Sequence, residues 1–341
     1  MVNTISYRID VLRSGAVFTT LRAVEPPRID CSADAEIKTS MSGTFVDDSS
    51  INYFTDELKP IAIINGVERP FGVFLVSRKT NDISNSTHVT LECYDRSFVL
   101  KSTTTEDILH IPAGTNYITA IEQLLVSAGL PLYIATPTTA TLATAREDWA
   151  VGTDYLTIIN ELLGEINYKE IWFNQDGYAV LEPVSDLTAA VIQHRYGSEI
   201  KLLRPEITSE IDLFSQPNVF IVVCDNPERG AAPLVAKAEN NNPLSSLSIL
   251  KRGRRIARTY KVSNVASQDE LNALAQRLAN ASMLQSEKIT FSTAIDGFHG
   301  VGDVCSINSP HVEGIFEEVS WNLKLSAGES MSHTAQRIII I

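Results

Sequence analysis

The first hundred residues show the alternation of apolar and polar positions that is typical of β-strands. Residues 35–45 and 88–95 alternate with a period of two. The apolar run 60–64 is followed by Asn65-Gly66, a strong signal for a two-residue hairpin, with residues 70–77 as the expected return strand. Because these hairpins follow one another without a helix between them, the pattern predicts an antiparallel sheet or barrel.

The middle of the chain changes to a helical period and contains an internal repeat. Residues 114–126 (GTNYITAIEQLLV) match residues 152–164 (GTDYLTIINELLG), with apolar positions three and four residues apart. Thr115 and Thr153 are the expected N-caps. The glycines expected to end the two helices are Gly129 and Gly164. Strand-like sequence follows each copy, so we expect a small α+β unit built from two helix–strand repeats.

The last third returns to strands, with one helix. Residues 218–224 are apolar almost throughout, which predicts a strand that is buried on both faces. Ser267 and Glu270 form a capping box that opens a helix over residues 268–284. A strand at 288–293 and a tight turn at Gly302-Asp303-Val304 follow. The apolar tail, residues 337–341, is expected to be paired in the fold or in an assembly.

Length and charge divide the chain into three. Its 341 residues, 44% hydrophobic and 20% charged, suit two or three globular domains. Residues 105–199 carry 3 basic against 13 acidic residues, whereas residues 1–104 carry 11 against 13 and residues 200–341 carry 14 against 15. The acidic middle therefore marks a domain of its own, and we predict boundaries after residues 104 and 199.

The composition also restricts location and partners. The sequence has no apolar run long enough to span a membrane and does not begin with a secretory signal pattern, which favours folding in a cytoplasm. The four cysteines occur singly, which is typical of free, partly buried thiols rather than of a metal or redox site. A net charge of −13 argues against general nucleic-acid binding.

Motifs that would indicate catalysis are missing. The sequence contains no phosphate-binding glycine loop, no HExxH pattern and no nucleophile elbow, and its six histidines are widely spaced. The adjacent carboxylate pairs are expected to be solvated surface charge, because neighbours in a strand point to opposite faces; they are Asp47-Asp48, Asp56-Glu57 and Glu317-Glu318. His299, near Asp296 and Asp303, is expected to stabilise a turn. We therefore predict no enzyme, no cofactor and no metal site.

One basic segment stands out against the acidic background. Six positive charges fall within eleven residues, namely Lys251, Arg252, Arg254, Arg255, Arg258 and Lys261. Phosphate contacts are one interpretation, but only Tyr260 could stack on a base. We expect this segment to be a subunit interface that meets an acidic surface, with the middle domain as one candidate.

The order of these signals resembles that of the tail hub (baseplate hub) proteins of contractile-tailed phages, defective prophages and phage-tail-like bacteriocins. In the last third the order is a strand at 218–224, a polar Asn-Pro-Leu-Ser loop, the basic segment, the helix at 268–284, the strand 289–293 and Gly302-Asp303-Val304. The motifs of the first third that agree are Ser42-Gly43-Thr44-Phe45, Leu58-Lys59-Pro60, Asn65-Gly66 and Phe71-Gly72-Val73-Phe74. The Gly-Thr-Asn-Tyr helix is similar to that family's inserted α/β domain.

This resemblance implies an α+β, mainly β fold with two tail-tube-like antiparallel β-barrel domains, 1–104 and 200–341, and the small α/β domain 105–199 inserted between them. It further implies a homotrimer whose ring joins a hexameric tail tube to a central spike. The partners would be the tube protein, the spike protein and other baseplate proteins, with DNA only passing through the lumen. The location would be a virion tail or a phage-tail-like particle assembled in the bacterial host cytoplasm.

Two other functions remain open at this point. A tail-tip protein that binds a receptor or glycan would use exposed aromatic side chains, and Trp149 and Trp172 are the candidates. A peptidoglycan hydrolase would show activity against cell walls.

Overall fold

The computed structural model describes residues 4–81, 87–184, 191–197, 202–210, 216–224, 233–262, 265, 267–284, 288–295, 299–309 and 312–338. It is mainly β, with five helices in these ranges, so the predicted α+β, mainly β class is confirmed. Within the same ranges, no helix combines the length and the apolar character needed to cross a membrane.

The N-terminal part is an antiparallel sheet. Its strands are β1 Ile5–Arg13, β2 Ala16–Thr20, β3 Arg28–Ser32, β4 Thr39–Val46, β5 Glu57–Ile64, β6 Val67–Pro70, β7 Phe74–Asn81 and β8 His88–Asp95. The strand pattern holds in detail, since Val89, Leu91 and Cys93 of β8 are all buried on one face. The short helix α1, Ser97–Ser102, leads out of this sheet into the middle of the chain.

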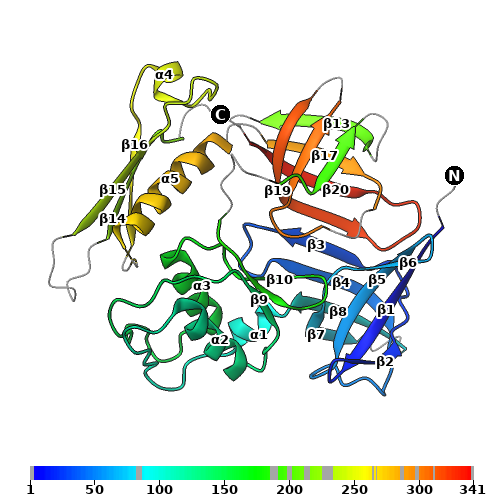
Figure 1. Ribbon diagram of the computed structural model, residues 1–341. Coiled ribbons are helices and arrows are strands. Elements are labelled where there is room, and N and C mark those ends of the chain that lie inside the picture. The colour runs from blue at the N-terminus through cyan, green and yellow to red at the C-terminus, as the bar shows by residue number, and fades with distance from the viewer. Residues whose placement is uncertain are drawn as a thin grey trace.

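The C-terminal part extends the same sheet. Its strands are β12 His194–Gly197, β13 Leu202–Glu210, β17 Lys288–Thr293, β18 Val304–Asn308, β19 Glu313–Lys324 and β20 Met331–Ile338. The two parts meet where β19 pairs with β3, with Trp321 opposite Cys31 (Figure 1). The result is one 14-stranded sheet in the order β13-β17-β20-β19-β3-β4-β8-β7-β5-β1-β2. Off this path, β18 pairs with β19, β12 pairs with β18, and β6 pairs with β5.

The predicted pair of barrels is not established. The strand pairings among the described residues form an open path that ends at β13 and β2, and none of them closes a ring. Strand alternation identifies which face of a strand is buried but not whether the last strand pairs with the first, and for that reason the pattern did not distinguish a sheet from a barrel.

The middle of the chain forms a small α/β unit. It contains α2 Tyr117–Ser127, β9 Tyr133–Ala135, α3 Tyr155–Glu165, β10 Trp172–Phe173 and β11 Ala179–Leu181. The strands form a three-stranded sheet in which β11 lies between β10 and β9. The turn between β10 and β11 has Gly177 at φ 80°.

The two repeat helices form as predicted, but their caps lie one residue further on. The Asn116 side chain accepts hydrogen bonds from the N–H groups of Ile118 and Thr119, and Asp154 accepts from Thr157 N–H. Thr115 and Thr153 instead donate their hydroxyls to carbonyls three residues back. Both residue types suit an N-cap, and only the backbone conformation decides between neighbours.

The helix ends differ between the two copies. Gly129 follows the C-cap Ala128 of α2 with φ 79°, as predicted. Gly164 lies inside α3, so the prediction that it ends that helix was wrong. Asn167, two residues beyond α3, takes the positive φ of 59° in this copy.

A separate two-layer unit lies beside the main sheet (Figure 1). It consists of β14 Val219–Cys224, β15 Leu234–Glu239, α4 Ile249–Arg252, β16 Ala257–Val262 and α5 Gln268–Leu284. The helix α5 occupies the predicted residues, and Glu270 N–H donates to the Ser267 hydroxyl at 3.1 Å. Because α5 covers one face of β14, Phe220 and Val222 are buried while Ile221 is half-buried, and the prediction that both faces are buried was wrong.

Two predicted turns, the predicted pairing of the tail and the predicted free cysteines all lie at least partly within the described residues. Asn65 and Gly66 form the hairpin turn with φ 53° and 82°, but the return strand is β6, four residues long, and not residues 70–77. Gly302 makes the turn into β18 with φ 70°. In the tail, Arg337 and Ile338 pair with β19, and residues 339–341 lie outside the described part. All four cysteines are buried and free.

The described residues form four hydrophobic cores, which hold these layers together. The core of the middle unit draws its buried residues from Leu100 to Leu181. The core under the N-terminal sheet also contains residues from the far end of the chain, which are Ile295, Trp321, Leu323, Leu325 and Met331. The third core lies between α5 and the β14–β16 sheet, and the fourth under β12 and β17–β20.

Candidate functional site

The basic segment lies at an exposed edge of the two-layer unit. Ser248 caps α4, and Gly253 ends it in the left-handed conformation, so that the chain turns into β16. The strand β16 pairs only with β14, and no other strand in the described part of the chain pairs with its second edge. Lysine and arginine on an edge strand oppose pairing with a second sheet edge, which is a structural use of these charges.

The six basic residues of this segment differ in their partners. Arg255 forms an ion pair with Glu239, and Arg252 donates to the Gln216 carbonyl at 2.7 Å. The other four are exposed and have no ion-pair partner among the described residues; they are Lys251, Arg254, Arg258 and Lys261. Four charges of this edge are thus open to another surface. The predicted contact with an acidic surface stays a prediction.

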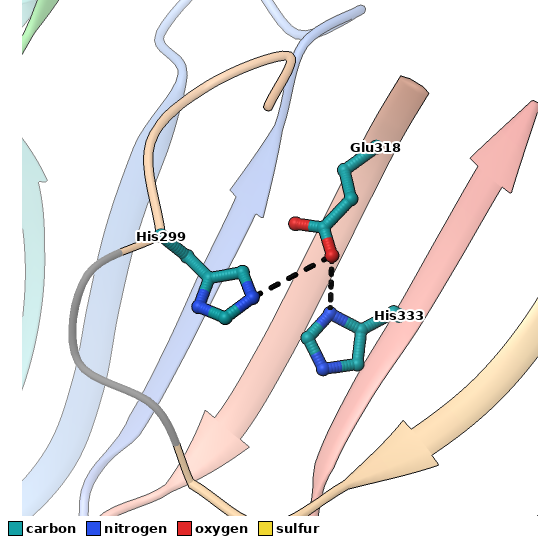
Figure 2. A group of neighbouring side chains, drawn as sticks. All are labelled: His299, Glu318 and His333. Atoms are coloured by element: carbon teal, nitrogen blue, oxygen red, sulfur yellow. Dashed lines mark ion pairs between the residues drawn. The ribbon is translucent and has the colours of Figure 1, made fainter. Parts of the chain in front are cut away.

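A second site lies inside the fold, where three chain segments meet. Figure 2 shows that His299 on the loop before β18, Glu318 on β19 and His333 on β20 point toward one another. Glu318 Oε1 is 2.9 Å from His333 Nδ1 and 3.5 Å from His299 Nε2. The side chains of both histidines are 0% exposed and that of Glu318 is 1% exposed, so solvent does not reach them.

Neighbouring polar groups orient the two histidines. The Thr293 hydroxyl lies 2.8 Å from His333 Nε2, and the Tyr196 hydroxyl lies 2.6 Å from His299 Nε2. His194 stacks on His299 with ring centroids 3.9 Å apart and is hydrogen-bonded through its own Nε2 to Asp303.

Burial controls the charges of this cluster. It lowers the pKa of His333, and the Glu318 carboxylate offsets this only in part, which favours a neutral imidazole. Burial alone would raise the pKa of Glu318, but contacts with His299 and His333 outweigh it and lower the pKa to about 2. At neutral pH the Glu318 carboxylate therefore faces a His333 ring whose charged form is disfavoured by burial, with no solvent to screen the carboxylate.

Sequence reasoning missed this cluster. The expectation that the paired carboxylates are surface charge was wrong for Glu318, and also for Asp56, which is 2% exposed and pairs with Arg13. The signal was that Glu318 alternates in β19 with Phe316 on the buried face. His299 is more than the turn residue that was expected. Asp296, named beside it, lies outside the described residues, whereas Asp303 does bind the turn through Gly300 N–H.

The tryptophans do not support the glycan-binding alternative. Trp149 is 6% exposed and donates its Nε1–H to Glu161 at 2.6 Å. Trp172 in β10 is only partly exposed. Sugar stacking requires an open ring face, which neither residue presents fully.

Three solved structures are similar to this chain over almost its whole length. The tail protein from Neisseria meningitidis MC58 superimposes with a TM-score of 0.69 at 12% identity, covering 97% of this chain and 96% of that one. The prophage MuSo2 43 kDa tail protein from Shewanella oneidensis gives 0.66 at 10% identity, with coverage of 97% and 98%. The prophage tail protein gp18 from Listeria monocytogenes EGD-e gives 0.60 at 13%, with coverage of 96% and 94%.

These similarities define the class of fold. No protein-family model and no curated protein sequence matches the chain. At such low identity the structural likeness demonstrates the fold alone, and that fold is the one found in phage tail proteins. The resemblance that the order of sequence signals indicated is therefore confirmed at the level of fold.

Proposed function

We propose that the chain is a structural hub of a phage-type tail or baseplate. The observation that carries this proposal is the similarity over nearly the full chain to three phage tail proteins. The closed histidine cluster supports a structural role, because a substrate cannot reach side chains that are 0% exposed. In this proposal the protein has no catalytic role and resides in a virion tail or a phage-tail-like particle that is assembled in the host cytoplasm.

We further propose that three copies form a ring. Each copy contributes two sheet regions, β1–β8 and β12, β13 and β17–β20, which lie side by side through β3 and β19. Three copies then present six such regions, the number that a hexameric tail tube requires, while the threefold axis fits a trimeric spike. We also propose that each sheet region forms a tail-tube-like barrel. The ring then surrounds a lumen that passes DNA, and it contacts other baseplate proteins.

The basic edge is the proposed contact between copies. Lys251, Arg254, Arg258 and Lys261 are exposed, and residues 105–199 carry a net charge of −10. An electrostatic contact of this kind fixes orientation more than it adds affinity. In this proposal, each copy consists of three domains, which are residues 1–104, 105–199 and 200–341.

The ring is tested by measuring mass in solution with a charge reversal. Arg254→Glu combined with Arg258→Glu leaves the internal Arg255–Glu239 pair intact, so the fold is spared. We expect a trimer for the natural chain and a shift toward monomer for the double variant, at an unchanged melting temperature. Arg78→Glu on β7, whose side chain is 69% exposed, is the matched control and should stay trimeric. A natural chain that remains monomeric with purified tube and spike proteins contradicts the ring.

A further inference from the structure

The buried cluster of His299, Glu318 and His333 brings together the atoms that a metal ion needs. One ligand atom from each side chain lies within 4.8 Å of the other two. A zinc ion with bonds of about 2.0–2.1 Å holds neighbouring ligand atoms about 3.0–3.4 Å apart, depending on geometry. The 2.9 Å and 3.5 Å separations around Glu318 Oε1 are close to that range.

The hydrogen bond of His333 Nε2 with Thr293 leaves Nδ1 of the same ring to face Glu318. The Thr293 hydroxyl donates to the Ala294 carbonyl at 2.9 Å, so it accepts from His333 Nε2–H at 2.8 Å. His333 Nδ1 faces Glu318 Oε1 at 2.9 Å, and a cation or a proton between the two atoms stabilises such a contact.

Glu318 is also short of donors. Apart from the ion-pair contacts of Oε1 with the two histidines, neither carboxylate oxygen nor His333 Nδ1 has a hydrogen-bond partner among the described residues, although all three atoms are fully buried. Buried carboxylates are normally paired, hydrogen-bonded or bound to metal. Of these three atoms, Glu318 Oε1 and His333 Nδ1 face each other inside the cluster (Figure 2).

We propose that His299, Glu318 and His333 bind one divalent transition-metal ion, with zinc as the preferred ion. Two imidazoles and one carboxylate are a ligand set that zinc accepts. The contact of His333 Nε2–H with Thr293 supplies the outer hydrogen bond that usually orients a metal-bound histidine. The Tyr196 hydroxyl, 2.6 Å from His299 Nε2, is the nearest oxygen for a fourth position.

The ion has a structural role. The loop that carries His299 also touches the middle unit, because Gln175 donates to the His299 carbonyl at 3.2 Å. The same loop accepts a hydrogen bond from Trp321 Nε1–H through Gly300. A metal bound to His299, Glu318 and His333 therefore fastens this loop to β19 and β20, at the place where the middle unit meets the continuous sheet.

The test is a metal measurement on the full chain. The protein is expressed with added zinc, dialysed, and its zinc content is determined by plasma mass spectrometry. We expect about one zinc per chain, and a melting temperature about 5 °C higher than after treatment with EDTA at elevated temperature. Cobalt in place of zinc should give visible absorption bands of a low-symmetry site.

Variants assign the ion to these residues. Glu318→Gln and His333→Gln keep side-chain size and should each lose the zinc and the cobalt bands, while Tyr196→Phe should keep the zinc and change the cobalt spectrum. His110→Ala is the matched control, since His110 is an exposed histidine beside Glu147. The proposal is overturned if the natural chain contains no zinc and EDTA does not change its melting temperature. In that case a proton, and not a metal ion, lies between Glu318 and His333. Zinc that is retained in Glu318→Gln and His333→Gln overturns it too.

Discussion

Arg146 lies buried among the helices of the middle unit, at 4% exposure. Its guanidinium forms ion pairs with Glu165 and Asp148, and it stacks over Trp149 with its central carbon 4.3 Å from the ring centroid. Glu165 also accepts the Tyr117 hydroxyl at 2.8 Å. A single cation thus neutralises two carboxylates, one of which is in the core.

We expect Arg146→Ala to lower the free energy of unfolding by about 3–5 kcal/mol, because Glu165 is left as a buried charge without its cation. The loss should shrink on acidification, since burial already raises the pKa of Glu165 and a protonated carboxyl needs no counter-ion. Denaturant unfolding at two pH values measures both effects. The exposed Arg78→Ala should change stability by less than about 1 kcal/mol, and equal losses for both variants contradict the argument.

The Arg255–Glu239 pair predicts a pH effect at the basic edge. Hydrogen bonds from Arg255 and Lys237 lower the pKa of Glu239 to about 2, against about 4.3 in an unfolded chain. The pair therefore stabilises the fold above about pH 4.3, and this contribution is lost as the pH falls toward 2.

Carboxyl NMR titration measures this pKa directly. We expect Arg255→Ala to raise the pKa of Glu239 toward the ordinary glutamate range. Arg254→Ala should leave it unchanged, because Arg254 has no ion-pair partner among the described residues. The same titration midpoint in all three proteins would show that the pair does not control Glu239.

The two helices of the repeat show how one sequence pattern gives two local structures. Seven of thirteen positions are identical between residues 114–126 and 152–164, and both copies fold as helices of 11 residues. Gly129 has φ 79° and follows its helix, whereas Gly164 is helical, and neither has a neighbour within 4 Å of an added Cβ. An alanine substitution at either glycine therefore makes no new side-chain contact, so its effect on stability reports the backbone conformation.

We expect Gly164→Ala to stabilise the chain by about 1 kcal/mol, since alanine favours a helix interior. Gly129→Ala should destabilise it by about 1–2 kcal/mol, since a side chain opposes the left-handed backbone. Thermal unfolding of the two variants and the natural chain checks both signs. Shifts in the same direction would mean that packing, and not backbone conformation, decides the effect.

At the scale of the whole molecule, the cores differ in how much of the chain they use. The buried residues of the middle core all lie between Leu100 and Leu181. The N-terminal core needs Trp321, Leu323 and Met331 from the other end, brought in by the pairing of β3 with β19. The units that fold independently should therefore differ from the three predicted domains, because the N-terminal core depends on residues from the last third.

We expect a fragment of residues 97–184 to fold alone, and a fragment of residues 1–104 to aggregate or remain partly unfolded. The first retains every buried residue of its core and loses only the partly buried Ile37, while the second exposes the edge of β3 and lacks five buried side chains from the last third. Circular dichroism and amide exchange on the two fragments measure this. A cooperatively folded fragment 1–104 would mean that the N-terminal sheet closes without β19.

The sequence by itself determined the elements and their order. Period-two alternation identified β8, the Asn65-Gly66 pair identified the turn between β5 and β6, and the apolar spacing identified α2, α3 and α5. Each of these depends on residues that are close in the chain, where a short pattern already decides which face is buried. The order of such elements was enough to indicate the phage-tail fold.

Only the tertiary structure decided which distant segments meet. It joined β19 to β3 in one continuous sheet, and it buried Glu318 between His299 and His333. No local pattern carries that information, because the three side chains come from separate segments and converge only when the strands pack. For the same reason, sequence alone predicts that a glutamate in a strand is exposed, and only the packing of other strands over its face shows that it is buried.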